Sequence, residues 1–146
     1  MEIRQNTTST LEDLIVNVKI KLAALWIVLM FLYAYVDILG FYKPGTVENI
    51  LNGIVWEFEI SQVWATSALL LMTVPIVMIF LSMTLKPAVN RWVNIIVAGL
   101  YIIISAGNAI GETWIFMWIG AAVEIAVLAL VIWYASTWPR SDGSRD

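Results

Sequence analysis

The sequence lacks two residue types on which much protein chemistry depends, cysteine and histidine. Without cysteine the chain has no disulfide, no thiolate nucleophile and no thiolate metal ligand. Without histidine it lacks the usual haem ligand, the commonest zinc ligand and the usual general base of a catalytic triad. We therefore predict no catalytic residues and no cofactor, and we rank an enzymatic function last; whether a metal binds is left open.

Charged residues are also scarce. They make up 13% of the 146 residues, whereas about a quarter is usual in soluble domains, and 61% of the residues are hydrophobic. This composition predicts an integral membrane protein whose first partner is the lipid bilayer. The net charge is -3 and the 8 basic residues are scattered along the chain, so no nucleic-acid-binding surface is expected.

Four hydrophobic runs are long enough to cross a bilayer as helices. The sequence predicts an all-α protein, a single transmembrane domain over residues 1–146 built as a four-helix bundle. The predicted spans are residues 20–42, 61–85, 91–110 and 113–135, with an outer loop at 43–60 and tails at 1–18 and 139–146.

The predicted outer loop has its own pattern. From Val47 to Val55 the apolar residues follow helical spacing, which indicates a short amphipathic helix on the membrane surface. From Trp56 to Ile60 apolar and acidic residues alternate, which suits either a strand or a strip lying at the lipid headgroups.

Basic residues near the ends of the spans predict the orientation. Only Lys43 lies on the side of the outer loop, and seven lie on the side of the termini. These seven are Arg4, Lys19, Lys21, Lys86, Arg91, Arg140 and Arg145. Because basic residues accumulate in cytoplasmic loops, we expect both termini in the cytoplasm and the chain in the inner (plasma) membrane.

The third span carries a polar stripe. Asn94, Ala98, Tyr101, Ser105, Asn108 and Glu112 are separated by steps of three and four residues, which places them on one face of a helix. Lipid does not tolerate such a face, so we expect other helices or trapped water to cover it.

Two further features concern how the helices pack. Pro75 in the second span removes a backbone hydrogen bond and should kink the helix, and Thr73 could help to satisfy the freed carbonyls. Gly120 and Ala121 form a small-residue notch in the fourth span that allows close approach of a neighbouring helix. The notch, together with the large surface that four short helices expose, favours a homo-oligomer or a partner membrane subunit.

Two acids lie within the spans, Asp37 toward the outer end of the first and Glu124 near the middle of the fourth. No Lys, Arg or His lies inside the membrane to neutralise them. Because a charged carboxylate at mid-bilayer costs about 2.5–3.5 kcal/mol on insertion scales, Glu124 should be protonated or bound to a cation.

Stacking the antiparallel helices by depth predicts which polar groups meet. Asp37 should lie near Ser105 and Asn108, and Glu124 near Tyr101 and Thr73. The candidate ligand- or ion-binding residues are Asp37, Glu124, Tyr33, Tyr101, Ser105, Asn108, Thr66 and Thr73. They suggest either a binding site or proton relay that opens outward, or hydrogen bonds that only hold helices together, since such bonds are common in membrane bundles.

Several segments resemble one family. These are Lys21 to Trp26, Tyr33 to Asp37, Pro75 to Met78 and, most specifically, Leu85 to Ile96 with its Asn-Arg-Trp segment. From about Lys19 to Trp138 the chain resembles an uncharacterised family of small bacterial and archaeal four-helix membrane proteins with a domain-of-unknown-function label, loosely similar to DoxX-like proteins. The resemblance implies a fold and a topology, and no activity or substrate.

Three functions are compatible with these observations. The first is a small multi-pass membrane protein whose acid-containing polar core opens outward and binds or conducts a small ligand or cation. The second is a structural or accessory subunit of a membrane assembly, without a ligand. The third, a membrane enzyme, ranks last because histidine and cysteine are absent and acids are sparse.

Overall fold

A computed structural model describes residues 15–139 of the chain. Its four long helices are α1 (Val18–Gly40), α3 (Gln62–Thr84), α4 (Pro87–Ala109) and α5 (Ile115–Ser136). All four are long and apolar enough to span a membrane. The predicted all-α membrane bundle is therefore confirmed. Arg4, Arg140, Arg145 and most of the two predicted tails lie outside the described residues.

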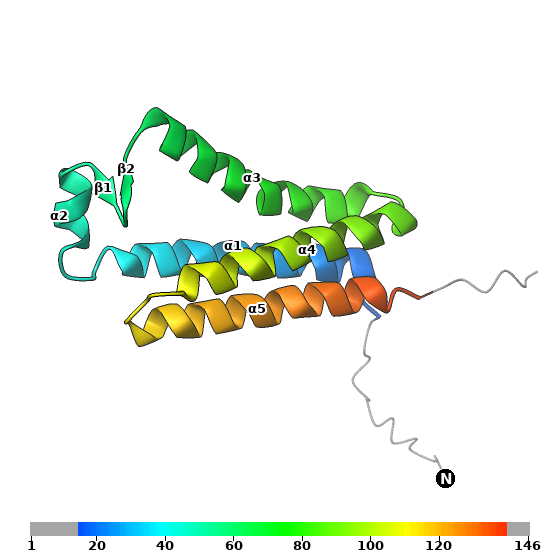
Figure 1. Cartoon of the computed structure of the whole chain (residues 1–146). Helices are drawn as coiled ribbons and strands as arrows, with labels where there is room; N and C mark the ends of the chain where they lie inside the picture. The colour runs from blue at the N-terminus through cyan, green and yellow to red at the C-terminus, as the bar shows by residue number, and fades with distance from the viewer. Residues whose placement is uncertain (1–14, 140–146) are drawn as a thin grey trace, which may run out of the picture.

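The bundle has two distinct ends (Figure 1). One end holds the start of α1, the connection between α3 and α4, and the finish of α5. We call it the terminal end. The opposite end, which we call the loop end, holds the segment between α1 and α3 and the connection between α4 and α5.

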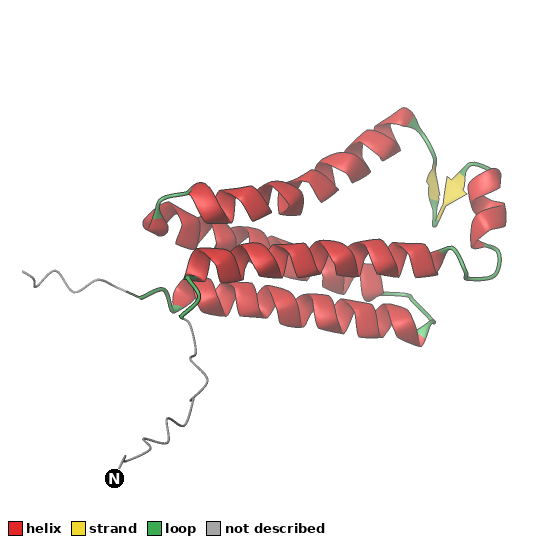
Figure 2. Ribbon diagram, turned by 180° about the vertical axis from the view of Figure 1, so that it is seen from behind, coloured by secondary structure: helices red, strands yellow, loops and turns green. Residues whose placement is uncertain are grey.

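Three of the helices pack side by side, and the fourth diverges from them. α5 packs along both α4 and α1, whereas α3 packs against α1 and only sparsely against α4. α3 bends in its middle and moves away from the other helices toward the loop end (Figures 1 and 2). Its buried residues, Pro75, Met78 and Ser82, all lie in its second half, so its first half leaves one side of the bundle uncovered.

The segment at the loop end contains a short helix and a small hairpin. The helix α2 (Thr46–Leu51) precedes strands β1 (Ile54–Val55) and β2 (Phe58–Glu59), which pair antiparallel. The predicted amphipathic helix exists, but the expectation that helical spacing continued to Val55 is wrong. Gly53 takes a left-handed conformation (φ 79°) that an α-helix does not accommodate, and the chain turns there into the hairpin.

An apolar core joins α1 and α5 toward the terminal end. Trp26, Leu22 and Leu29 of α1 meet Leu128 and Val131 of α5, and each of these side chains is at most 1% exposed. Burying a large apolar side chain stabilises a packed interior because it fills space that would otherwise be empty. This core fixes the relative positions of α1, α4 and α5.

The small-residue notch of α5 is filled from within the chain. A Cβ atom placed on Gly120 would lie 2.7 Å from Cγ2 of Val36 on α1, closer than side-chain atoms approach each other. The glycine therefore allows α1 and α5 to pack tightly near the loop end. Because Val36 occupies the notch, Gly120 gives no argument for a second copy of the chain.

Candidate functional site

The buried face of α4 follows the predicted stripe for most of its length. Asn94, Ala98, Tyr101 and Ser105 are buried, but Asn108 is exposed and Ala109 is buried in its place. A strict seven-residue repeat drifts by about 20° per heptad on a straight helix, which explains why the stripe loses the buried face near its end. Glu112 lies beyond the end of α4.

Toward the terminal end, the buried polar groups satisfy one another. The Asn94 Oδ1 atom accepts hydrogen bonds from Trp26 Nε1 (2.7 Å) and Ser82 Oγ (3.2 Å). The Asn94 side-chain amide donates to Asn90 Oδ1 (2.6 Å) and to the Asn90 carbonyl (2.9 Å). The Asn90 amide in turn donates to the Ser82 carbonyl (2.6 Å). We call Trp26, Ser82, Asn90 and Asn94 the asparagine cluster.

The asparagine cluster joins three helices and has no contact with solvent, since each of its four side chains is 0% exposed. Sequence reasoning placed Asn94 on the buried face but missed Ser82 and Asn90 as its partners. The spacing of Asn90 and Asn94, four residues apart in one helix, was an available signal because such residues share a face. The role of Ser82 depends on how α3 is aligned against α4, which the sequence does not show.

Tyr101 forms its hydrogen bond with the backbone of α3 and not with an acid. Its hydroxyl donates to the carbonyl of Leu71, four residues before Pro75. Proline has no N–H, so this carbonyl has no partner within its own helix. The Thr73 hydroxyl donates to the carbonyl of Leu69 (2.7 Å), so the role in satisfying the freed carbonyl belongs to Tyr101 instead of Thr73.

Toward the loop end, two hydroxyl groups lie close to the buried acid Glu124. Tyr33 and Ser105 share a hydrogen bond of 3.2 Å between their hydroxyl oxygens. The Glu124 side chain lies beside the Ser105 hydroxyl and close to Tyr33 and Asp37. We call Tyr33, Asp37, Ser105 and Glu124 the acid cluster.

Glu124 lies beside Ser105, which is one turn nearer the loop end than Tyr101 on α4. Its expected proximity to Tyr101 and Thr73 stays a prediction. Side chains slope toward the N-terminus of their own helix, and the N-terminus of α5 is at the loop end. A long side chain such as Glu124 therefore reaches toward the loop end.

Exposure separates the members of the acid cluster. Glu124 is 4% exposed, Tyr33 7% and Ser105 0%, whereas Asp37 is exposed. The cluster thus runs from a buried acid to an accessible one. It is the only part of the candidate set in which side chains from three helices come together at an acid.

The other candidate residues do not complete this cluster. Thr66 is exposed and its hydroxyl donates to the carbonyl of Gln62 (2.7 Å), so like Thr73 it bonds within α3. Asn108 is exposed on α4. The Thr66 and Thr73 hydroxyls are therefore bonded within α3, and the first half of that helix lies away from the bundle.

An ion pair joins two segments at the loop end. Lys43, just after α1, places its Nζ atom 2.7 Å from a carboxylate oxygen of Glu112, between α4 and α5. Both side chains are partly buried, at 21% and 13% exposure. Within residues 15–139 this is the one ion pair, and it joins the two connections at the loop end.

Comparison with known proteins gives a family and no established activity. No curated protein and no solved structure matches the chain. The looser likeness to DoxX-like proteins stays a prediction. A model of a family of unknown function matches residues 13–144, nearly the whole chain, which confirms the resemblance to an uncharacterised family. With its four membrane-spanning helices, the chain is a small membrane protein that belongs to this family, DUF6326.

Proposed function

We propose that the protein binds a small cation in the acid cluster and admits it from the loop end. The observation that carries the proposal is Glu124, which is 4% exposed in the middle of a membrane-spanning helix. The described basic residues lie at the ends of the helices or in the connections. A buried carboxylate without a positive partner is unfavourable, and a bound cation or proton removes that cost.

The neighbouring groups suit a cation of low charge. Glu124 is accompanied by the hydroxyl oxygens of Ser105 and Tyr33, which can serve as neutral ligands. Among residues 15–139 no group of three or more His, Cys, Asp or Glu side chains is placed to hold a metal ion. One or two carboxylates with hydroxyl oxygens favour a monovalent inorganic cation or a protonated amine.

The position of α3 supports access from the loop end. Its first half contributes no buried residue, so the side of the acid cluster that carries Asp37 is not covered by this helix. Asp37 would attract a cation at the surface, and Glu124 would hold it in the interior. Seven basic residues on the terminal side against one on the loop side support an orientation with both termini in the cytoplasm of a plasma-membrane protein.

Ligand-dependent stabilisation of the purified protein tests the proposal. The full chain in mild detergent is melted in the chlorides of sodium, potassium, ethylammonium and choline, at equal concentration, with tryptophan fluorescence as the readout. A cation at 100 times its Kd stabilises the folded state by about 2.7 kcal/mol, which raises Tm by about 5–10 °C in a chain of this size. Glu124→Gln should abolish this increase, and Asp37→Asn should weaken it.

The matched control is Glu57→Gln, which removes an exposed acid of the hairpin turn and should keep the full increase. An equal response of the wild-type protein and Glu124→Gln to every salt would contradict the proposal. So would an absence of stabilisation by all four cations. If binding is found, cation uptake into vesicles that contain the protein separates transport from binding alone.

A structural or accessory role is the second candidate, and the first half of α3 favours it. This half exposes both apolar residues and the polar Gln62, Thr66 and Ser67. A helix from a second copy or from another membrane subunit would cover that surface. Purification in mild detergent distinguishes the candidates: a stoichiometric partner, with no cation response, supports the structural role.

A further inference from the structure

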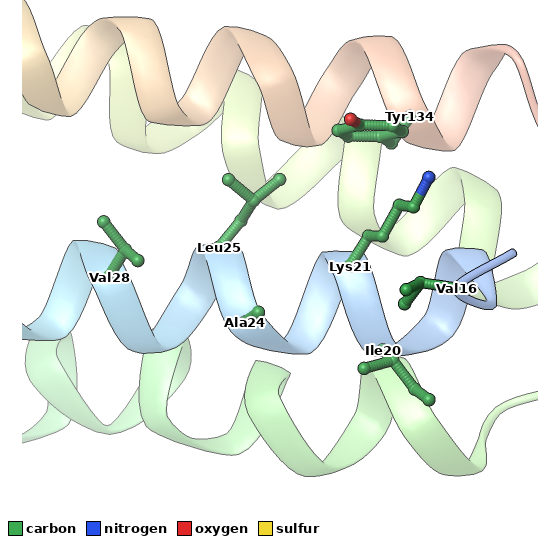
Figure 3. Close-up of a pocket in the computed structure, with 7 residues that line it drawn as sticks. All are labelled: Val16, Ile20, Lys21, Ala24, Leu25, Val28 and Tyr134. Carbon is green, nitrogen blue, oxygen red and sulfur yellow. The ribbon is translucent and has the colours of Figure 1, made fainter. Parts of the chain in front are cut away.

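A groove on the lipid-facing side of the terminal end has the features of a site for one particular lipid class. It is a shallow, open groove of about 320 Å³, lined on one side by α1 and the residues just before it and on the other by Tyr134 of α5. Apolar side chains of α1 line its length, and Lys21 and Tyr134 stand at one end (Figure 3). The lining residues are Val16, Ile20, Lys21, Ala24, Leu25, Val28 and Tyr134.

The groove covers most of the thickness of one leaflet of a bilayer. From Ile20 to Val28, within α1, the lining covers eight residue steps, or about 12 Å at 1.5 Å per residue. One leaflet contributes about 15 Å to the hydrocarbon core. An extended acyl chain therefore fits along α1, with its polar end at the level of Lys21 and Tyr134.

The positive charge of Lys21 at the polar end of the groove favours a lipid with an anionic headgroup. The Lys21 ammonium lies 5.1 Å from the centre of the Tyr134 ring, a cation–π distance, and Figure 3 shows the lysine reaching toward that ring. No acid in the described part of the chain forms an ion pair with Lys21. The described acids outside the middle of the bundle, from Asp37 to Glu112, lie at the loop end. The ammonium therefore keeps hydrogen-bond donors for a lipid phosphate.

Lys19 differs from Lys21 although it lies only two residues away. Its ammonium donates to the carbonyl of Met83 at the end of α3 (3.3 Å) and does not line the groove. Lys86 is exposed and lies in the connection between α3 and α4. Among residues 15–139, Lys21 is thus the one basic side chain that lines this apolar groove.

We propose that this groove binds an anionic phospholipid, with one acyl chain along Ala24 and Leu25 and the phosphate on Lys21. The site is separate from the acid cluster, which lies toward the opposite end of the bundle. Its occupation would hold α1 and α5 together at the terminal end, because the lipid would contact Lys21 on one helix and Tyr134 on the other.

Native mass spectrometry of the full chain in mild detergent tests the proposal. The probes are phosphatidylglycerol and phosphatidylcholine with the same acyl chains, added in equal amounts. The wild-type protein should retain phosphatidylglycerol preferentially. Lys21→Gln should lower that retention about fivefold, since one basic residue near an anionic headgroup contributes about a factor of five. Lys21→Arg should preserve it.

Two further variants separate the groove from a general surface attraction. Ala24→Phe fills the channel and should lower the retention of both lipids, while Lys86→Gln removes a nearby charge outside the groove and should change neither. Equal retention of the two lipids by the wild-type protein would overturn the proposal. It would also be overturned if Lys86→Gln lowered retention as strongly as Lys21→Gln, or if Ala24→Phe had no effect.

Discussion

The two ends of the bundle interior differ in how their buried polar groups are paired. Toward the terminal end, the asparagine cluster satisfies its donors and acceptors with one another and is closed to solvent. Toward the loop end, the acid cluster holds a carboxyl group beside two hydroxyls without a positive partner and reaches the surface at Asp37. The first arrangement contributes to stability, and the second leaves a buried carboxyl group without a positive partner among the described residues.

This difference follows from the course of α3. Its second half packs on the bundle and supplies Ser82 to the asparagine cluster, whereas its first half diverges and supplies no side chain to the acid cluster. A buried polar network stabilises a protein only when its members are satisfied. The comparison therefore predicts that substitutions in the two clusters change stability in opposite directions.

The largest expected effect is in the asparagine cluster. Asn94→Leu removes four hydrogen bonds and leaves Trp26, Ser82 and Asn90 with buried unpaired groups. At about 0.6 kcal/mol for each of the two bonds to other helices, and about 1–3 kcal/mol for the buried Asn90 oxygen that loses its partner, the free energy of unfolding should fall by about 2–4 kcal/mol. Reversible unfolding in mixed micelles measures it. Asn108→Leu, at an exposed position of the same helix, is the control and should stay near the wild-type value.

In the acid cluster, a substitution is expected to raise the free energy of unfolding instead of lowering it. Glu124→Met replaces an acid that is unfavourable in a membrane helix, so the free energy of unfolding without ligand should rise by about 1 kcal/mol. The same unfolding assay measures it. A loss of stability comparable with that of Asn94→Leu would show that Glu124 holds the helices together, and the contrast between the clusters would then be wrong.

A smaller effect is expected at the boundary between the clusters, where Tyr101 bonds the carbonyl of Leu71. Tyr101→Phe should lower the free energy of unfolding by about 1 kcal/mol. In a Pro75→Ala background the helix regains the backbone N–H that can bond this carbonyl, so the same change should have less effect. A double-mutant cycle measures the coupling, and additive effects would exclude the proposed link.

The smallest effect is expected at the surface of the loop end. The ion pair of Lys43 and Glu112 is partly exposed, so solvent screens it, and a double-mutant cycle with Lys43→Gln and Glu112→Gln should give a coupling of about 0.5 kcal/mol. The coupling should shrink as salt is added. A salt-independent coupling would indicate that packing rather than charge links the two connections.

The sequence alone is sufficient to predict the four long helices and most of the buried stripe on α4. Hydrophobic runs of membrane length predict helices well because the backbone must satisfy its own hydrogen bonds in lipid. The burial of Asn94, Tyr101 and Ser105 followed from their spacing in the same way. The exposure of Asn108 did not, because a repeat of seven drifts around a helix with 3.6 residues per turn.

The partners of the polar groups were less predictable. The bond from Tyr101 to the Leu71 carbonyl joins a side chain to a backbone atom, and no residue type at position 71 signals such a bond. The pairing of Ser82 with Asn94 requires the alignment of two helices. The proximity of Glu124 to Ser105 depends on the direction of a long side chain, which reaches toward the N-terminus of its helix, and depth counted along the backbone does not give that direction.

The contact between Gly120 and Val36 has a consequence for the two acids. Val36 precedes Asp37 directly, and Gly120 lies one turn before Glu124. The separation of the carboxyl groups is therefore governed by a position that carries neither of them. Any side chain at position 120 would push α1 away from α5 and increase the distance between the two carboxyl groups. An ion bound by both acids would then have to bridge that larger distance.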